Sequence, residues 1–204
     1  MSPSGSQNSG GRSRRQGKRS RPLDETALKD LALSYAARFA TSGAKLEAYL
    51  ARKIRERGVA TDADGRDVQL DVPGTVARLI ELGYVDDEAY ARMRSRDLSA
   101  RGYGARRIEQ TLWAAGIEEE LRQSSAPDAA AARRSAILLA RKRGFGPFSR
   151  KELDLKLREK QIAAMLRAGH GFETVRFIIH STGEEELDAW LDEAIAEAEE
   201  GSTW

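Results

Sequence analysis

Apolar residues recur every three or four positions along nearly the whole chain from residue 23 onward. The first such stripe comprises Ala27, Leu28, Leu31, Ala32 and Tyr35. A second stripe comprises Leu46, Tyr49, Leu50 and Ile54, and it stops before Gly58, a residue type that often follows a helix end. Spacings of three and four place side chains on one face of an α-helix, so the pattern predicts amphipathic helices and no strands.

The central part of the chain repeats this pattern in short segments. Val76, Leu79 and Ile80 form a stripe between Pro73, which suits a helix start, and Gly83. Further helices are predicted from about 87 to 100 and from about 105 to 115. Short helices joined by short turns are typical of helical bundles and helical repeats.

Two segments of the chain echo each other, which predicts tandem repeats. Residues 35–58 and 90–116 each begin a helix with Tyr-Ala, continue through a turn of small residues or glycine, and end in a basic helix followed by glycine. A third copy is expected within 128–180. The predicted fold is therefore all-α, with three tandem three-helix, helix-turn-helix-like repeats in an elongated, curved array. We divide the chain into a basic tail (1–22), a first repeat with its linker (23–71), a second repeat (72–124), a third repeat (125–183) and an acidic C-terminal helix (184–204).

Charge distinguishes the two ends of the chain, although the net charge over 204 residues is only +2. The tail 1–22 contains six basic residues and no acidic one, whereas 184–204 contains nine acidic residues and no basic one. The tail lacks aromatic and β-branched residues, so it is predicted to be disordered. It can serve as a solubilising segment or as a non-specific arm for nucleic acid. Leu187, Trp190, Leu191 and Ile195 predict an amphipathic C-terminal helix that closes the last repeat or folds back over a basic face.

The composition argues against several classes of function. The chain has no cysteine, so disulfides, a thiolate nucleophile and a cysteine-type zinc site are excluded. His170 and His180 are the only histidines, and neither has a Cys or Asp partner nearby in the sequence. We predict no enzymatic activity, no metal and no cofactor. No stretch is apolar enough to cross a bilayer and the N-terminus lacks the apolar core of a signal peptide, so we expect a soluble, cytoplasmic protein.

The acidic run Asp86-Asp87-Glu88 can be interpreted as a metal site or as a helix start. Asp86 follows the turn at Gly83 and precedes an amphipathic helix, which is the position of an N-cap. Asp87 and Glu88 would then lie in the first turn, where carboxylates interact favourably with the helix dipole. We favour the helix start, because few further metal ligands lie nearby.

The basic residues after this run are the candidate contact sites. Arg92 and Arg96 are spaced i, i+4 and share one helix face, opposite Tyr90 and Met93, which are expected to be buried. The full set of candidates is Arg92, Arg96, Arg101, Arg106 and Arg107, with Lys142 and Arg143 as a second patch. A basic run can be a solvated face and nothing more, but its recurrence in separate repeats favours a surface that follows a polyanion or a filament. Trp113, Phe145 and Phe148 are expected to pack in or between the repeats.

The segment "LGYVDDEAYARMRSRDLSARGYGARRIEQTLWAAGI" (82–117) resembles the central repeat of the RecX family, bacterial regulators of the recombinase RecA. The resemblance rests on motifs in a fixed order: Leu82-Gly83-Tyr84, Asp86-Asp87, Tyr90-Ala91, the basic helix, the glycine turn, Arg107-Ile108 and Gly116-Ile117. Residues 27–58 resemble the first repeat, and "LARKRGFGPF" (139–148) resembles the third repeat of alphaproteobacterial members. The tail and the acidic end lie outside the family pattern.

This resemblance implies a monomeric regulator that binds in the groove of the filament formed by RecA on single-stranded DNA. It would modulate, and mainly inhibit, the recombinase, ATPase and co-protease activities of RecA. Two other functions remain open from the sequence: a stand-alone DNA-binding protein with helix-turn-helix-like modules, and an adaptor that uses its helical grooves for protein contacts only.

Overall fold

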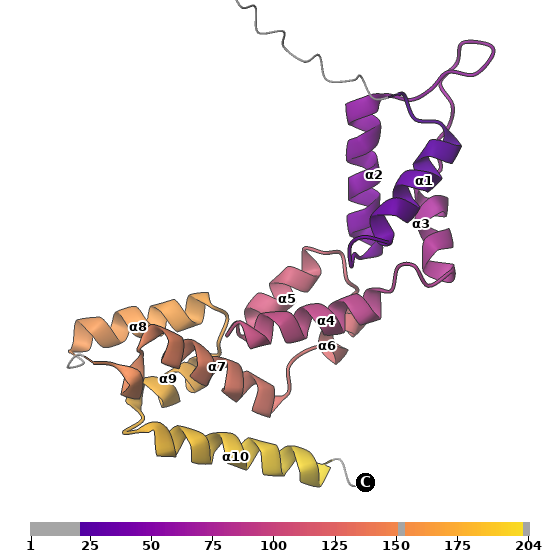
Figure 1. The fold of residues 1–204 in the computed structure, drawn as a ribbon. Helices are drawn as coiled ribbons and strands as arrows, with labels where there is room; N and C mark the ends of the chain where they lie inside the picture. The colour runs from indigo at the N-terminus through magenta and orange to yellow at the C-terminus, as the bar shows by residue number, and fades with distance from the viewer. Residues whose placement is uncertain (1–20, 151–153, 202–204) are drawn as a thin grey trace, which may run out of the picture.

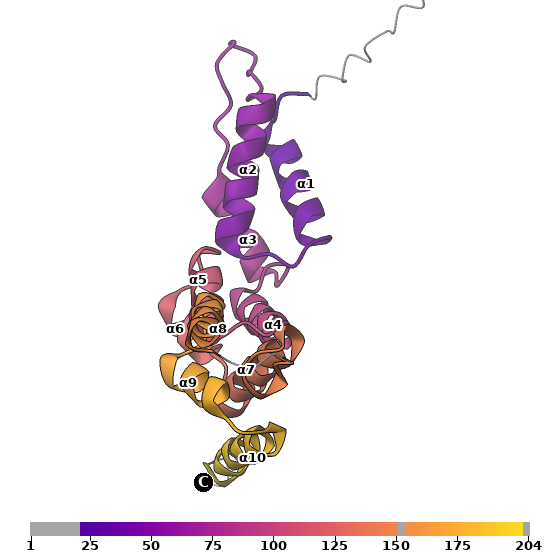
Figure 2. The ribbon, with the colours of Figure 1, turned by 90° about the vertical axis from the view of Figure 1, so that its left-hand side faces the viewer.

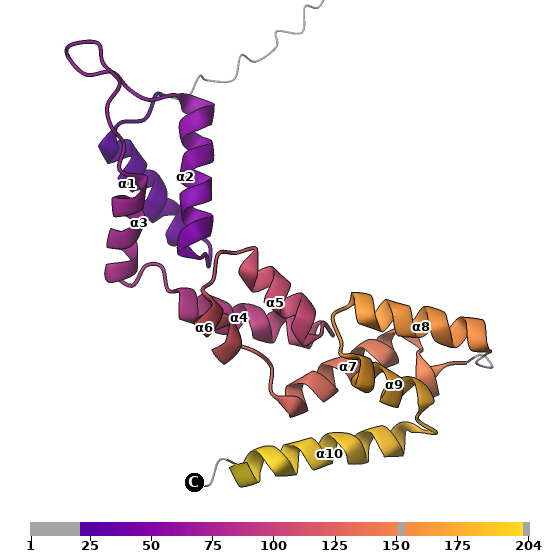
Figure 3. The ribbon, with the colours of Figure 1, turned by 180° about the vertical axis from the view of Figure 1, so that it is seen from behind.

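A computed structural model of the chain describes residues 21–150 and 154–201. Its regular structure in these ranges is helical, apart from two isolated bridges, Leu23 with Val59 and Thr61 with Asp67. The helices form an elongated, curved array of three units that follow one another along the chain (Figures 1, 2 and 3). This confirms the predicted all-α repeat fold. The predicted disordered tail lies, except for Arg21 and Pro22, outside the described residues.

The first unit consists of α1 (Glu25–Ala36), α2 (Gly43–Arg57) and α3 (Val72–Glu81), each of which packs against the other two. Its core contains most of the first two predicted stripes and is completed by Val76, Leu79 and Val85. The helix that begins at Val72 therefore belongs to the first unit. Our boundary at residue 72 was wrong, because an apolar stripe shows which face of a helix is buried but not which neighbour covers it. Ile80, predicted to belong to the apolar stripe of the third helix, is 46% exposed, so that assignment was wrong.

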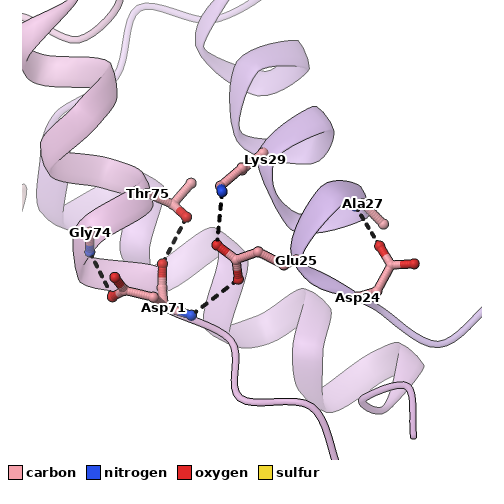
Figure 4. A network of polar contacts seen from close by, with 7 residues as sticks. All are labelled: Asp24, Glu25, Ala27, Lys29, Asp71, Gly74 and Thr75. Atoms are coloured by element: carbon pink, nitrogen blue, oxygen red, sulfur yellow. Dashed lines mark hydrogen bonds and ion pairs between the residues drawn. The ribbon is translucent and has the colours of Figure 1, made fainter. Parts of the chain in front are cut away.

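Polar contacts at the helix starts fix α3 against α1 (Figure 4). Asp71 caps α3 by accepting a hydrogen bond from the Gly74 amide at 2.8 Å. The Glu25 carboxylate accepts one from the Asp71 amide at 3.4 Å and also pairs with Lys29 at 3.2 Å. The Glu25 carboxylate of α1 thus binds Asp71, the N-cap of α3.

The second unit consists of α4 (Asp87–Ala100), α5 (Ala105–Trp113) and α6 (Glu119–Ser124). Its core is separate from the first and contains Tyr90, Ala91, Leu98, Ile108, Leu112, Ala115 and Ile117. The short helix α6 was not predicted from periodicity. It is held by Arg122, which pairs with Glu109 of α5 at 2.6 Å and donates to the Ile117 carbonyl at 2.6 Å.

The third unit consists of α7 (Ala129–Arg143), a 3-10 turn η1 (Gly146–Phe148), α8 (Leu155–Arg167) and α9 (Phe172–His180). Its core is built around Ile137, Met165, Val175, Ile178 and Ile179. Phe145 and Phe148 pack against that core, as predicted.

The last helix, α10 (Glu184–Gly201), lies along α7 and closes the array (Figures 1 and 3). Leu187 is buried in the core of the third unit, and the Trp190 ring stacks on Phe177 with their centroids 4.5 Å apart. Arg133 of α7 donates to the Trp190 carbonyl and pairs with Glu193 at 3.0 Å. The helix is therefore amphipathic as expected, with its apolar side on the third unit.

The junction between the first and second units, called here the first joint, is made by side chains at helix ends. The Ser42 hydroxyl donates to the carbonyl of Ala115 at 2.5 Å, and Asp87 accepts from the amide of Gly43 at 2.9 Å. The Lys45 ammonium donates to the Tyr90 hydroxyl at 2.8 Å. The start of α2 is thus bound to both α4 and the end of α5.

The junction between the second and third units, called here the second joint, is made mainly by the backbone. The Gly104 amide donates to the Ala168 carbonyl at 3.0 Å, and the Arg106 amide donates to the Gly169 carbonyl at 3.1 Å. A Cβ atom on Gly104 would overlap the carbonyl of Gly169, so the two loops approach more closely than any side chain allows. The turn Gly102-Tyr103-Gly104, expected only to link two helices, is thus also an inter-unit contact.

His170 completes the second joint. Its side chain is 2% exposed, and Nε2 lies 3.0 Å from the Gly102 carbonyl. Burial lowers the pKa of His170 from its ordinary value of 6.5, although the hydrogen bond to Gly102 acts in the opposite direction. The buried imidazole is therefore disposed to be neutral at neutral pH.

Candidate nucleic-acid interface

The acidic run at the start of α4 caps the helix and does not gather metal ligands. Asp86 is the N-cap, and its carboxylate accepts from the Ala89 amide at 2.8 Å. Glu88 pairs with Arg92 at 2.6 Å. Asp87 has a role that the sequence did not reveal, because it reaches across the first joint to Gly43. Within 21–150 and 154–201, no group of three His, Asp or Glu side chains is placed to hold a metal ion.

The α4 helix presents Arg92 and Arg96 on its exposed face, as the i, i+4 spacing predicted. Tyr90 is buried as expected, but Met93 is 43% exposed, so its assignment to the buried face was wrong. Arg94 is half-buried instead and pairs with Asp97 at 3.0 Å. Arg92 and Arg96 of α4 are thus exposed, whereas Arg94 is held within the unit by its ion pair.

A groove of about 490 Å³ runs between α4 and the start of the third unit. Arg92 and Arg96 line it on one side, and Arg134 of α7 lines it on the other. The loop between α6 and α7 forms one end of the groove and contributes Ser125. Arg134 and Ser125 were not among the predicted contact residues, since only the packing of α7 beside α4 brings them there.

The next three predicted residues lie beside the second joint. Arg101 ends α4 and pairs with Asp97 at 3.1 Å. Arg106 and Arg107 are exposed in the first turn of α5, next to the Gly169 loop. Trp113, predicted to be packed, is 69% exposed at the other end of α5. It lies seven residues after Arg106, and therefore on the same side of the helix.

Lys142 and Arg143 are exposed at the end of α7. They line a separate groove of about 530 Å³, together with Arg141 and Arg150. Arg141 pairs with Glu184 of α10 at 3.0 Å, and its guanidinium lies 5.2 Å from the centroid of the Phe148 ring. The predicted residues are therefore distributed over the α4 groove, the second joint and the end of α7.

The acidic helix α10 neutralises part of the third unit. It pairs with Arg133 and Arg141 of α7. In the described part of the chain, Arg134 of the α4 groove forms no ion pair with α10 or any other element. Of these three arginines of α7, the two that contact α10 are neutralised and the one that lines the α4 groove is not. None of the described helices is long and apolar enough to cross a membrane.

Comparison with known proteins identifies the family. Residues 86–124, which comprise α4 to α6, match the family model "RecX, second three-helix domain". The chain is 32% identical to the regulatory protein RecX of Myxococcus xanthus over 169 residues, or 80% of this chain and 90% of that protein. It is 31% identical to RecX of a Mycobacterium species (strain JLS) over 73% of this chain and 80% of that protein.

Solved structures agree on the fold. The crystal structure of RecX from Lactobacillus salivarius superposes with a TM-score of 0.58 at 19% identity, covering 80% of this chain and 96% of that one. The match of the central unit to the family model also places a repeat boundary just before α4, where the packing places it. Together with these similarities, the repeat architecture shows that the chain belongs to the RecX family of regulatory proteins.

Proposed function

We propose that this chain binds the filament of RecA on single-stranded DNA and mainly inhibits its recombinase, ATPase and co-protease activities. It would act in the cytoplasm, as a monomer and without a cofactor. The observation that carries the proposal is the set of exposed arginines on the second unit of an array whose three units have separate cores. Such units can follow a helical filament, and their basic residues can face its phosphates or acidic surface.

The arginines beside the second joint provide the most direct test. Arg106 and Arg107 are exposed, and no ion pair involves either side chain within the described ranges. Reversing both charges should therefore leave the fold intact while removing attraction to a polyanionic filament. We expect R106E/R107E to inhibit RecA ATPase on single-stranded DNA about tenfold less effectively than the wild type, with unchanged helicity.

A control for this experiment reverses the same amount of charge on the first unit. Arg66 and Arg78 have side chains that are 80% and 65% exposed, so R66E/R78E should keep most of the inhibition. Full inhibition by R106E/R107E would contradict the assignment of these residues. An equal loss in both variants would mean that net charge alone matters.

A stand-alone DNA-binding function is the second candidate, and the α5 helix favours it. Trp113 is exposed on the same side of α5 as Arg106, and an exposed aromatic ring on a helix face that also carries a basic residue is suited to stacking on an unpaired base. Titration with naked oligo(dT) and with RecA-coated oligo(dT) at physiological salt distinguishes the two functions. Filament binding predicts tighter association with the coated strand, whereas the second candidate predicts equal or weaker association.

A further inference from the structure

The groove between α4 and α7 combines features that suit a particular ligand chemistry. Its wall includes the three arginines Arg92, Arg96 and Arg134, and also the serines Ser95, Ser99, Ser124, Ser125 and Ser135. Guanidinium groups and serine hydroxyls are among the side chains that contact phosphate oxygens in nucleic-acid complexes. The hydroxyls of Ser124 and Ser135 already donate to the carbonyls of Leu121 and Ala132, so the donors of the groove are the arginines of two units and the remaining serines.

The arginines of this groove are largely free of protein partners. Within the described ranges, neither Arg96 nor Arg134 forms an ion pair, and Arg92 is bound only to Glu88. Asp128 is the one carboxylate among the residues that line the groove. It caps α7 by accepting from the Ala131 amide at 2.6 Å. Arg92 is thus partly neutralised by Glu88, whereas Arg96 and Arg134 leave an excess of positive charge at the groove.

Ser125 is an independent indication of a missing partner. The residue is 7% exposed, and its Oγ is buried with no hydrogen-bond partner in the described structure. A buried hydroxyl without a partner costs about 1–3 kcal/mol. A ligand oxygen that enters the groove at Ser125 would accept this hydrogen bond and remove the cost.

The start of α7 borders the groove and carries backbone amides that have no partner in the described structure. This helix is 15 residues long, and Pro127 and Asp128, which immediately precede it, line the groove. The first amides of a helix lack partners within the helix and carry partial positive charge. The Asp128 side chain accepts from Ala131 only, so the amides of Ala129 and Ala130 remain available in the described structure.

We propose that this groove binds a phosphate group in the backbone of a nucleic-acid strand. A phosphodiester presents several acceptor oxygens in different directions. This matches donors that come from α4, from α7 and from the loop between α6 and α7. The proposal deepens the proposed function, since it assigns Arg92 and Arg96 to the nucleic acid and adds Arg134 and Ser125 to the contact residues. An acidic peptide is the competing ligand, and the test separates the two.

The test measures the affinity of the full chain for oligo(dT) as a function of salt, without RecA. We expect R134Q to bind about tenfold more weakly than the wild type. Loss of one phosphate contact should also reduce the slope of log K against log salt by about 0.7. R66Q is the matched control, because Arg66 is exposed in the first unit, and it should leave both quantities nearly unchanged.

The S125A variant tests the buried hydroxyl separately. If Ser125 has no partner in the free protein, S125A should melt at the same or a higher temperature and yet bind oligo(dT) more weakly. A purely structural serine would instead lower the melting temperature on removal. Such a fall, with unchanged affinity, would overturn the role of Ser125.

The outcomes also distinguish this inference from the proposed function. Unchanged affinity and salt slope in R134Q would overturn the phosphate site, even if the wild type inhibits RecA. Binding of a poly-glutamate peptide that depends on Arg134, without binding of oligo(dT), would also overturn it. A wild type that binds oligo(dT) through Arg134 but leaves RecA ATPase unaffected would support the groove and contradict the proposed function.

Discussion

The two joints of the array connect neighbouring units through different kinds of hydrogen bond. At the first joint, side chains of Ser42, Lys45 and Asp87 bridge neighbouring units at helix ends. At the second joint, amide and carbonyl groups around Gly104 and Gly169 bond directly, and the side chain of His170 is enclosed between the loops. Neither joint has a core of its own, since each of the three cores lies within one unit.

The difference bears on how strictly each joint fixes its neighbours. Side-chain hydrogen bonds can be lost one at a time, and the long lysine can adjust its reach. Backbone groups in direct contact have no such freedom, because an added Cβ atom must displace one unit from the other. We therefore expect substitutions at the second joint to cost more than those at the first.

The largest effect should come from G104A. The new Cβ atom would overlap the Gly169 carbonyl, so we expect the free energy of unfolding to fall by about 3 kcal/mol. G171A is a matched control. Both glycines are helix N-caps with ordinary φ values of −86° and −70°, but a Cβ atom on Gly171 would meet nothing within 4 Å. Urea denaturation measures the free energy of unfolding of both variants, and an equal decrease in the two would contradict a close backbone contact at Gly104.

An intermediate effect is expected from D87A at the first joint. Loss of a hydrogen bond between a carboxylate and the Gly43 amide should lower the free energy of unfolding by about 1.5–2 kcal/mol. D86A should cost about 1 kcal/mol, because it removes only the cap of α4. Hydrogen exchange locates the two effects: D87A should accelerate exchange at Gly43 and D86A at Ala89. Protection of Gly43 in D87A would argue against the inter-unit bond.

The smallest effect concerns the pH dependence of the second joint. Since burial lowers the pKa of His170 below 6.5, the unfolded chain binds a proton at a pH where the folded chain does not. The contribution of His170 to stability is therefore complete above pH 6.5 and declines as the pH falls through and below that value. H170Q should flatten the decline of stability between neutral and mildly acidic pH, whereas H180Q should retain it. Identical pH profiles for H170Q and the wild type would contradict a neutral buried imidazole.

Local features of the fold could be predicted from the sequence because their causes are local. The cap at Asp86 and the stripes of α1 and α2 depend on residues within one or two turns of one another. The repeat architecture followed from the similarity of 35–58 to 90–116. The exposure of Arg92 and Arg96 followed from their spacing.

Features that depend on distant residues could not be predicted in this way. Periodicity did not show that α3 belongs to the first unit, nor that Trp113 has no neighbour to cover it. Asp87 reaches Gly43 across 44 positions of sequence, and its residue type suggested only a helix start. The α4 groove exists because α7 lies beside α4, so Arg134 and Ser125 carried no distinguishing signal in the sequence.

The acidic last helix sets the length of the array. The last repeat of a stack has an apolar face that no further repeat covers. Like the edge strand of a sheet, such a face can pair with another copy of the chain. Here Leu187 and Trp190 occupy that face, and the outer surface of α10 carries carboxylates. In the described part of the chain, this end of the array therefore presents carboxylates to a second molecule in place of the apolar face of the third unit. The position of α10 thus disfavours head-to-tail stacking of copies of the chain through the third unit.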